Sequence, residues 1–286
     1  MRLVLDTCTV RNYIQPKKVS PENIPNISGL GSYVPHILVS IADTAFLELI
    51  CQLLNGGIPF DDWAQRIHEI DTVLEPSLPI FPGGNELAVM SGIIQNIKFN
   101  IEDTKIFQQT AWRFIRDARS KDDILKKELI FADSKGVQSL SFMGETFTKL
   151  LMDNAHMNWS DNIEKIYSKL DQFAPGISLK PLISGTLANL PAEIPIKLKP
   201  VVMALCQYVY LYGQGYNPSS DKRKGDIFDW TLLFALPLPA IICTVDQPLV
   251  NRLRQIDASE FRAIIKVEEL NIHLANGTLH QILPSQ

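Results

Sequence analysis

Most of the simple sequence signatures of function are missing from this chain. None of its four cysteines lies in a CxxC pair, and its five histidines form no HExxH or similar ligand spacing, which excludes zinc centres of those kinds. Basic residues are not in excess, because 27 Lys and Arg stand against 31 Asp and Glu and the net charge is −4. Bulk charge therefore cannot attract nucleic acid, and any such contact needs a local basic patch.

Long apolar segments are also missing. The longest uncharged apolar run, residues 230–245, is shorter than a membrane span and contains two prolines. Asp6 interrupts the apolar residues at the amino terminus, which argues against a signal peptide. The cysteines lie far apart in apolar surroundings and are expected to be reduced thiols; they are Cys8, Cys51, Cys206 and Cys243. We expect a cytoplasmic protein without a membrane partner.

The composition itself is that of an ordinary globular protein. The chain has 286 residues, of which 46% are hydrophobic and 20% are charged. Short apolar runs typical of buried strands occur at residues 3–5, 36–41, 240–245 and 263–267. Helical patterns follow the first three of these runs, and strands alternating with helices predict a three-layer α/β/α fold with a central parallel sheet.

The strand-bearing segments lie at the two ends of the chain. From about residue 85 to 175 the pattern changes to successive helices with few strand signals, and residues 174–200 are rich in proline. We therefore predict one α/β domain from residues 1–75 and 200–286, interrupted by a helical insertion at 85–199. Residues 15–35 are expected to form a surface loop, 76–84 a break, and the end of the chain a short tail.

Carboxylates recur where predicted strands end and helices begin. Asp6 directly follows the first strand, and Asp246 follows the strand at residues 240–245. Open α/β sheets bind their ligands at this edge. Asp226 and Asp229 are three residues apart at the start of a helical pattern, so they share a face near the positive end of the helix dipole.

Glu48 is a fifth acidic residue, inside an apolar helical segment, where a carboxylate needs a partner or a role. Clustered carboxylates repel one another, and such clusters usually bind a cation; hard oxygen ligands select Mg²⁺ or Mn²⁺. Thr7 and Thr244 could hydrogen-bond a phosphate or a ligating carboxylate. Further phosphate contacts could come from Arg11, Asn12, Lys222, Arg223 and Lys224.

The order of these motifs resembles that of the PIN-domain family of nucleases, over roughly residues 1–70 and 200–270. The matching motifs are Leu5-Asp6-Thr7, Phe46-Leu-Glu-Leu49, Asp226-Ile-Phe-Asp229 and Thr244-Val-Asp246. The resemblance implies a metal-dependent endoribonuclease that hydrolyses RNA phosphodiester bonds. It assigns catalysis to Asp6, Glu48, Asp229 and Asp246, with Asp226 as a further metal ligand. Because small PIN proteins are often toxins, it also leaves open an inhibitor or partner protein.

Two other interpretations stay open on the sequence alone. In the first, the acids are helix caps and ion-pair partners in a catalytically inactive PIN-like scaffold that binds a partner protein through the helical insertion. In the second, residues 3–10 and 225–229 resemble motifs of the haloacid-dehalogenase phosphatases, although Cys8 stands where that family has its general-acid aspartate.

Overall fold

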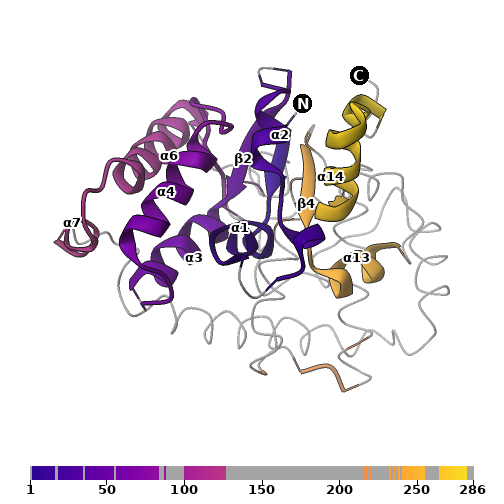
Figure 1. Cartoon of the computed structure of the whole chain (residues 1–286), viewed down its shortest axis with the longest axis horizontal. Coiled ribbons are helices and arrows are strands. Elements are labelled where there is room, and N and C mark those ends of the chain that lie inside the picture. Colours follow the sequence, from indigo (N-terminus) through magenta and orange to yellow (C-terminus); the bar gives the residue numbers. More distant parts are fainter. Residues whose placement is uncertain are drawn as a thin grey trace, which may run out of the picture.

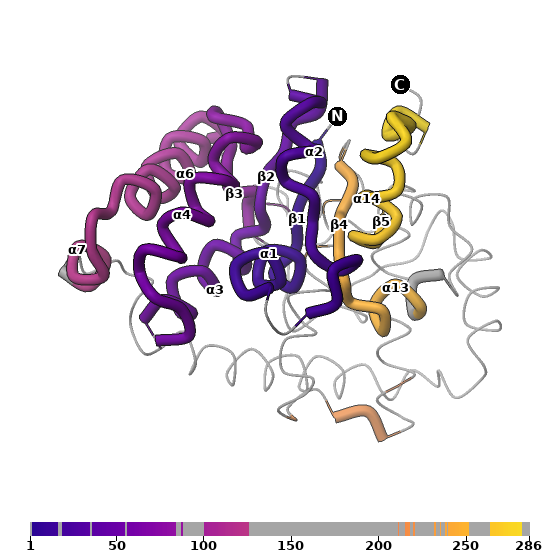
Figure 2. Tube along the Cα trace, in the orientation of Figure 1, coloured from indigo at the N-terminus to yellow at the C-terminus, as the bar shows by residue number. Residues whose placement is uncertain are grey.

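The structure of the chain, a computed structural model, describes residues 2–16, 19–34, 36–54, 56–83, 87, 100–126, 211, 215–217, 220, 232, 235, 238, 240–254 and 264–281. Its centre is a five-stranded sheet in which all neighbouring strands described are parallel. The strands are β1 (Arg2–Leu5), β2 (Leu38–Ala42), β3 (Ile80–Phe81), β4 (Ala240–Thr244) and β5 (Ile264–Lys266). Figure 2 shows them in the spatial order β3-β2-β1-β4-β5. This confirms the predicted α/β fold with a parallel sheet to which both ends of the chain contribute.

The strands form where the sequence is continuously apolar. All five residues of β4 are buried, as are Leu3, Val4 and Leu5 of β1. Such runs are typical of parallel strands that are covered on both faces. β1 lies at the centre of the sheet, where Leu5 is paired with Ile41 on one side and with Cys243 on the other.

Helices follow the strands, as the sequence predicted. The described helices are α1 (Thr7–Ile14), α2 (Ile27–Gly31), α3 (Asp43–Leu54), α4 (Phe60–Asp71), α6 (Ile101–Arg116), α7 (Lys121–Lys126), α13 (Gln247–Arg254) and α14 (Val267–Asn276). Figure 1 shows α4 and α6 beyond the β2 side of the sheet and α13 and α14 on the β4 side, with α1 between them. α2 contacts both α4 and α14 and so joins the two groups of helices.

The end of α3 and the start of α4 are held by specific local contacts. Gly56 takes the left-handed conformation, with φ of 70°, and its N–H donates to the Leu53 carbonyl at 3.2 Å. Glycine is favoured there because the left-handed region is unfavourable for a residue with a Cβ. Trp63 of α4 is completely buried, and its indole N–H donates to the carbonyl of Leu49 at 3.0 Å. The α3–α4 pair is therefore anchored by both packing and hydrogen bonding.

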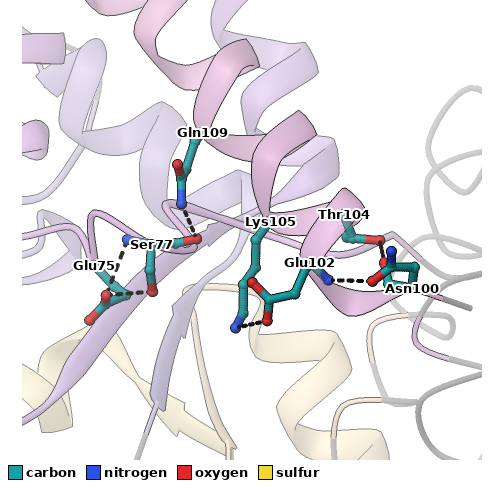
Figure 3. Close-up of polar contacts among 7 residues, drawn as sticks. All are labelled: Glu75, Ser77, Asn100, Glu102, Thr104, Lys105 and Gln109. Atoms are coloured by element: carbon teal, nitrogen blue, oxygen red, sulfur yellow. Dashed lines mark hydrogen bonds and ion pairs between the residues drawn. The ribbon is translucent and has the colours of Figure 1, made fainter.

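α6 lies within the region predicted to be helical and packs against α4 and β3. Figure 3 shows its amino-terminal cap, where the Asn100 side chain accepts a hydrogen bond from the Glu102 N–H at 3.0 Å. Its middle is attached by the Gln109 amide, which donates to the Ser77 carbonyl at 3.0 Å. α6 and α7 are helices within the predicted insertion, and the insertion as a whole stays a prediction. Residues 85–86, 88–99 and 127–199 of the predicted insertion lie outside the described residues.

Four elements were not expected from the sequence. Within the predicted loop at 15–35, η2 (Pro21–Asn23) and α2 form, and α2 is capped by the Asn26 side chain, which accepts from Gly29 N–H at 2.9 Å. β3 lies in the predicted break and beyond residue 75, where the first segment of the domain was expected to end. α14 replaces the expected short tail, because buried Val267, Leu270 and Leu274 give it one apolar face.

Candidate functional site

The order of the strands defines a particular place on the sheet. From β1 the chain moves outward to β2 and β3, whereas β4 pairs with the other side of β1 and leads to β5. β1 and β4 are therefore the adjacent strands at which the direction of strand addition reverses. Ligand sites of open α/β sheets form at such a switch point, just beyond the carboxyl ends of the strands. Asp6 and Asp246 follow these two strands.

Asp6 is held from several sides. Its backbone N–H donates to the Cys243 carbonyl at 3.0 Å, which extends the β1–β4 ladder by one residue. Its Oδ1 accepts from the Thr9 N–H at 2.7 Å and so caps α1. Its Oδ2 accepts from the hydroxyl of Thr244 at 2.5 Å. Because the side chain is only 5% exposed, the carboxylate is fixed in position.

Thr244 connects the two predicted aspartates. The residue is completely buried, and its hydroxyl oxygen also accepts from the Asp246 N–H at 2.9 Å. Asp246 in turn uses Oδ1 to accept from the Leu249 N–H at 2.8 Å, so it caps α13. Both aspartates thus cap helices that begin at the same edge of the sheet, and one hydroxyl lies between them.

The carboxylates of Asp6 and Asp246 interact electrostatically. Burial is the main cause that raises the pKa of Asp6, and the negative charge of Asp246 raises it further. Hydrogen bonds from Thr244 and Thr9 oppose this rise because they stabilise the ionised form. Burial also raises the pKa of the Cys243 thiol well above its ordinary value, with the Asp6 charge as a second cause. Cys243 is therefore a protonated, inert thiol at the base of the site.

A second contact joins α1 to the helix that carries Glu48. The hydroxyl groups of Thr7 and Thr44 lie 2.8 Å apart and share a hydrogen bond. Glu48 is one helical turn after Thr44 on α3, and its Oε1 accepts from the Gln52 amide at 3.2 Å. Thr44, Glu48 and Gln52 thus form a polar stripe with a spacing of four residues. Within the part of the chain that the structure describes, the buried Oε1 of Gln52 has no hydrogen-bond partner.

The other residues predicted to contact substrate have different positions. Arg11 is exposed, and its guanidinium donates to the sulfur of Cys8 at 3.5 Å. Asn12 donates to the Asn23 carbonyl at 3.2 Å, so its amide holds the segment around η2. Asp226, Asp229, Lys222, Arg223 and Lys224 lie outside the described residues.

The structure therefore brings together part of the predicted site. Asp6, Thr244 and Asp246 form one hydrogen-bonded group. Among the described residues, no three side chains of Asp, Glu, His or Cys lie close enough to hold a metal ion, so Glu48 does not complete such a group with Asp6 and Asp246. The four-carboxylate site that includes Asp229 stays a prediction.

Two residues of the site were missed by the sequence analysis. Thr9 gives its N–H to Asp6 and its hydroxyl to the Cys243 carbonyl at 3.1 Å, and Thr44 makes the contact with Thr7. Thr9 could have been found as the third residue after a capping aspartate. Thr44 precedes Glu48 by four residues, but its contact with Thr7 depends on how α3 packs against α1, which no local pattern encodes.

Comparisons of the chain with protein-family models, with curated proteins and with solved structures find no match. The resemblance to PIN-domain nucleases therefore stays a prediction from the motifs. The described helices include none with both the length and the apolar character needed to cross a membrane. Cys8, Cys51 and Cys243 form no disulfide among the residues described.

Proposed function

We propose that this protein is a metal-dependent ribonuclease that hydrolyses RNA phosphodiester bonds at the edge of the sheet formed by β1 and β4. The observation that carries the proposal is the buried Asp6 carboxylate, hydrogen-bonded to Thr244 and close to Asp246 at the switch point of a parallel sheet. The proposal includes the finer architecture of a PIN-like, three-layer domain with a helical insertion.

The charge arrangement supports a cation-binding role for the pair. Burying a carboxylate near a second one costs stability, because both burial and the neighbouring charge oppose ionisation of Asp6. A helix cap alone does not require this arrangement, since an uncharged asparagine caps a helix as well as aspartate does. A bound divalent cation would offset both the cost of burying the Asp6 charge and its repulsion from Asp246.

The oxygen atoms available suit a hard cation. Asp6 and Asp246 supply carboxylates, and on Asp246 the Oδ2 atom accepts no hydrogen bond from any described residue. Mg²⁺ and Mn²⁺ prefer such ligands, and the chemistry they supply is a bound water of lowered pKa near the scissile phosphate. Thr244 would keep Asp6 ionised and oriented. We propose Asp226 and Asp229 as the residues that complete the site.

The test compares wild type with Asp6→Asn and Asp246→Asn. Each variant keeps the side-chain size and the capping oxygen but removes one negative charge. With total RNA and Mn²⁺, we expect cleavage by wild type and a loss of several orders of magnitude in both variants. Asp103→Asn, an exposed acid in the first turn of α6, is the matched control and should retain activity.

Three further measurements separate the proposal from its rivals. EDTA should abolish cleavage, and Mn²⁺ should raise the melting temperature of wild type more than that of either variant. An inactive scaffold would show neither effect, and a phosphatase would instead release phosphate from a monoester such as p-nitrophenyl phosphate. If Asp6→Asn and Asp246→Asn both cleave RNA at the wild-type rate, the proposal is wrong.

A further inference from the structure

A groove lies at the opposite end of α1 from Asp6. Its volume is about 400 Å³, which is within the range of small-ligand sites. It is formed by the end of α1, the α3–α4 connection and the first half of α4. Its apolar walls are Ile14, Pro16, Ile58 and Pro59. Its polar residues are Gln15, Asp62, Gln65 and Arg66. We refer to it as the α1/α4 groove.

The α1/α4 groove and the candidate site lie at the two ends of one pair of helices. At their beginnings, α1 and α3 are joined by the Thr7–Thr44 contact. At their ends, the Gln15 amide donates to the Gly57 carbonyl at 3.3 Å, and the Gly57 N–H donates to the Gln52 carbonyl at 2.9 Å. Since α1 has eight residues, it separates the two places by about 12 Å. A short single strand can span that distance.

Arg66 makes two contacts with its neighbours at the wall of the groove. Its guanidinium stacks over the Tyr13 ring at 5.1 Å, and its Nη1 donates to Glu69 at 3.1 Å. The Tyr13 hydroxyl donates to the same Glu69 oxygen at 2.5 Å. These contacts involve the face of the guanidinium and one N–H of Nη1, and the guanidinium has further N–H donors that could serve a ligand.

The remaining polar groups of the groove are mostly acceptors. One N–H of the Gln15 amide donates to the carbonyl of Gly57 and one N–H of the Gln65 amide donates to Glu69, which leaves one N–H donor on each amide. Their amide oxygens, and the carboxylate of Asp62, accept no hydrogen bond from the residues described. The groove thus offers more acceptors than amide donors beside the cation of Arg66, between apolar walls.

We propose that the α1/α4 groove binds a guanine base of the single-stranded RNA substrate. Guanine carries two adjacent N–H donors, at N1 and N2, that match one carboxylate, and two acceptors, O6 and N7, that match an arginine. Uracil has one ring N–H donor and cannot pair with both the carboxylate and the arginine in the same way. Unstacked bases of single-stranded RNA are recognised in this way, between apolar or guanidinium planes. The inference names a substrate subsite and therefore rests on the proposed ribonuclease function.

The binding test needs no catalysis. Guanosine, inosine and uridine 5′-monophosphates share the same phosphate, and binding to the full chain is measured by titration in EDTA. We expect the guanine nucleotide to bind about tenfold or more tightly than the uracil nucleotide. Inosine, which lacks the N2 amino group, should lie between them. Asp62→Asn should weaken binding of the guanine nucleotide about tenfold, because one bidentate contact is lost.

Asp61→Asn is the matched control, because Asp61 is also exposed in the first turn of α4 but does not line the groove. It should bind the guanine nucleotide like wild type. Equal affinity for the guanine and uracil nucleotides, or equal effects of the two substitutions, would overturn the inference. So would a groove that binds arginine amide in preference to the guanine nucleotide, since its occupant would then be a basic peptide.

Cleavage mapping separates this inference from the function on which it rests. With RNA and Mn²⁺, wild type should cut at a fixed distance from guanosines, and Asp62→Asn should cut without that preference. If cleavage does not depend on guanosine and no nucleotide binds, the proposed subsite is wrong but the ribonuclease proposal stands. If guanine nucleotide binds but RNA is not cleaved, the ribonuclease proposal is wrong and the groove is still a guanine-binding site.

Discussion

The hydroxyl of Thr244 provides the sharpest single test of the site. Thr244→Val removes the donor to Asp6 and the acceptor for the Asp246 N–H, while valine fills nearly the same space. A buried charged group that loses its hydrogen bond costs about 1.5–3 kcal/mol. Asp6 is 5% exposed, so water cannot replace the lost donor. We expect Thr244→Val to lower the free energy of unfolding by about 2–3 kcal/mol at neutral pH.

The loss should depend on pH in a defined direction. Burial, the largest cause, raises the pKa of Asp6 above its ordinary value of 3.8 in the folded protein. The contribution of Asp6 to stability is therefore fully present below its ordinary pKa and is lost as the pH rises through its pKa in the folded protein. Thr244→Val raises the folded pKa further, because the hydroxyl bond favours the ionised form. The difference from wild type should thus be small in acid and grow as Asp6 ionises.

The assay is urea unfolding of both proteins in EDTA across a pH series from acid to weakly alkaline. Ser40→Ala is the control, since Ser40 is also fully buried and its hydroxyl donates to the Leu78 carbonyl at 2.6 Å. Its other partner, Arg2, stays charged throughout, so the Ser40→Ala loss should not vary with pH. A Thr244→Val loss that is the same at every pH would refute the assignment of this bond to an ionised Asp6.

Two further predictions test the groove wall and a helix end. Tyr13→Phe removes a bond that lowers the pKa of Glu69, so it should cost about 1 kcal/mol at neutral pH, with partial solvent screening. That cost should shrink as the pH falls through the pKa of Glu69 in the folded protein, which lies below its ordinary value. Urea unfolding of both proteins at several pH values measures it. Gly277→Ala should lower stability by about 1 kcal/mol, because φ is 66° there. Gly31→Ala in α2 should not, since its Cβ would meet only Val73 at 3.8 Å; equal melting temperatures for the two variants would contradict the strain argument.

The sequence was informative where an element is continuously apolar. β1 and β4 are short, mostly buried apolar runs. β1 stands directly before Asp6 and β4 ends two residues before Asp246, so both the strands and the positions of these aspartates followed from the pattern. β3 could not be found in this way. It has two residues between Pro79 and Pro82, and it forms because β2 offers an open edge to Ile80 and Phe81.

The site was predicted less completely than the sheet. The pair of aspartates follows from strand ends alone, but the link through Thr244 depends on which strand lies beside β1. The sequence separation between Asp6 and Thr244 is 238 residues, and no local signal encodes such a contact. The α1/α4 groove was not predicted either, because it is formed by three segments whose packing has no periodic signature.

The same polar contacts help to specify how the two ends of the chain pair. All residues of β4 are buried, so apolar patterning alone penalises a one-residue slip of this strand less than it would for a strand with one exposed face. Such a slip would move the Thr244 hydroxyl to the other face of the sheet and leave the buried Asp6 carboxylate without its donor. It would also displace the Cys243 carbonyl, which accepts from both the Asp6 N–H and the Thr9 hydroxyl. The buried carboxylate thus disfavours every register except the one that brings Asp246 to the site, which links correct assembly of the sheet to assembly of the candidate active site.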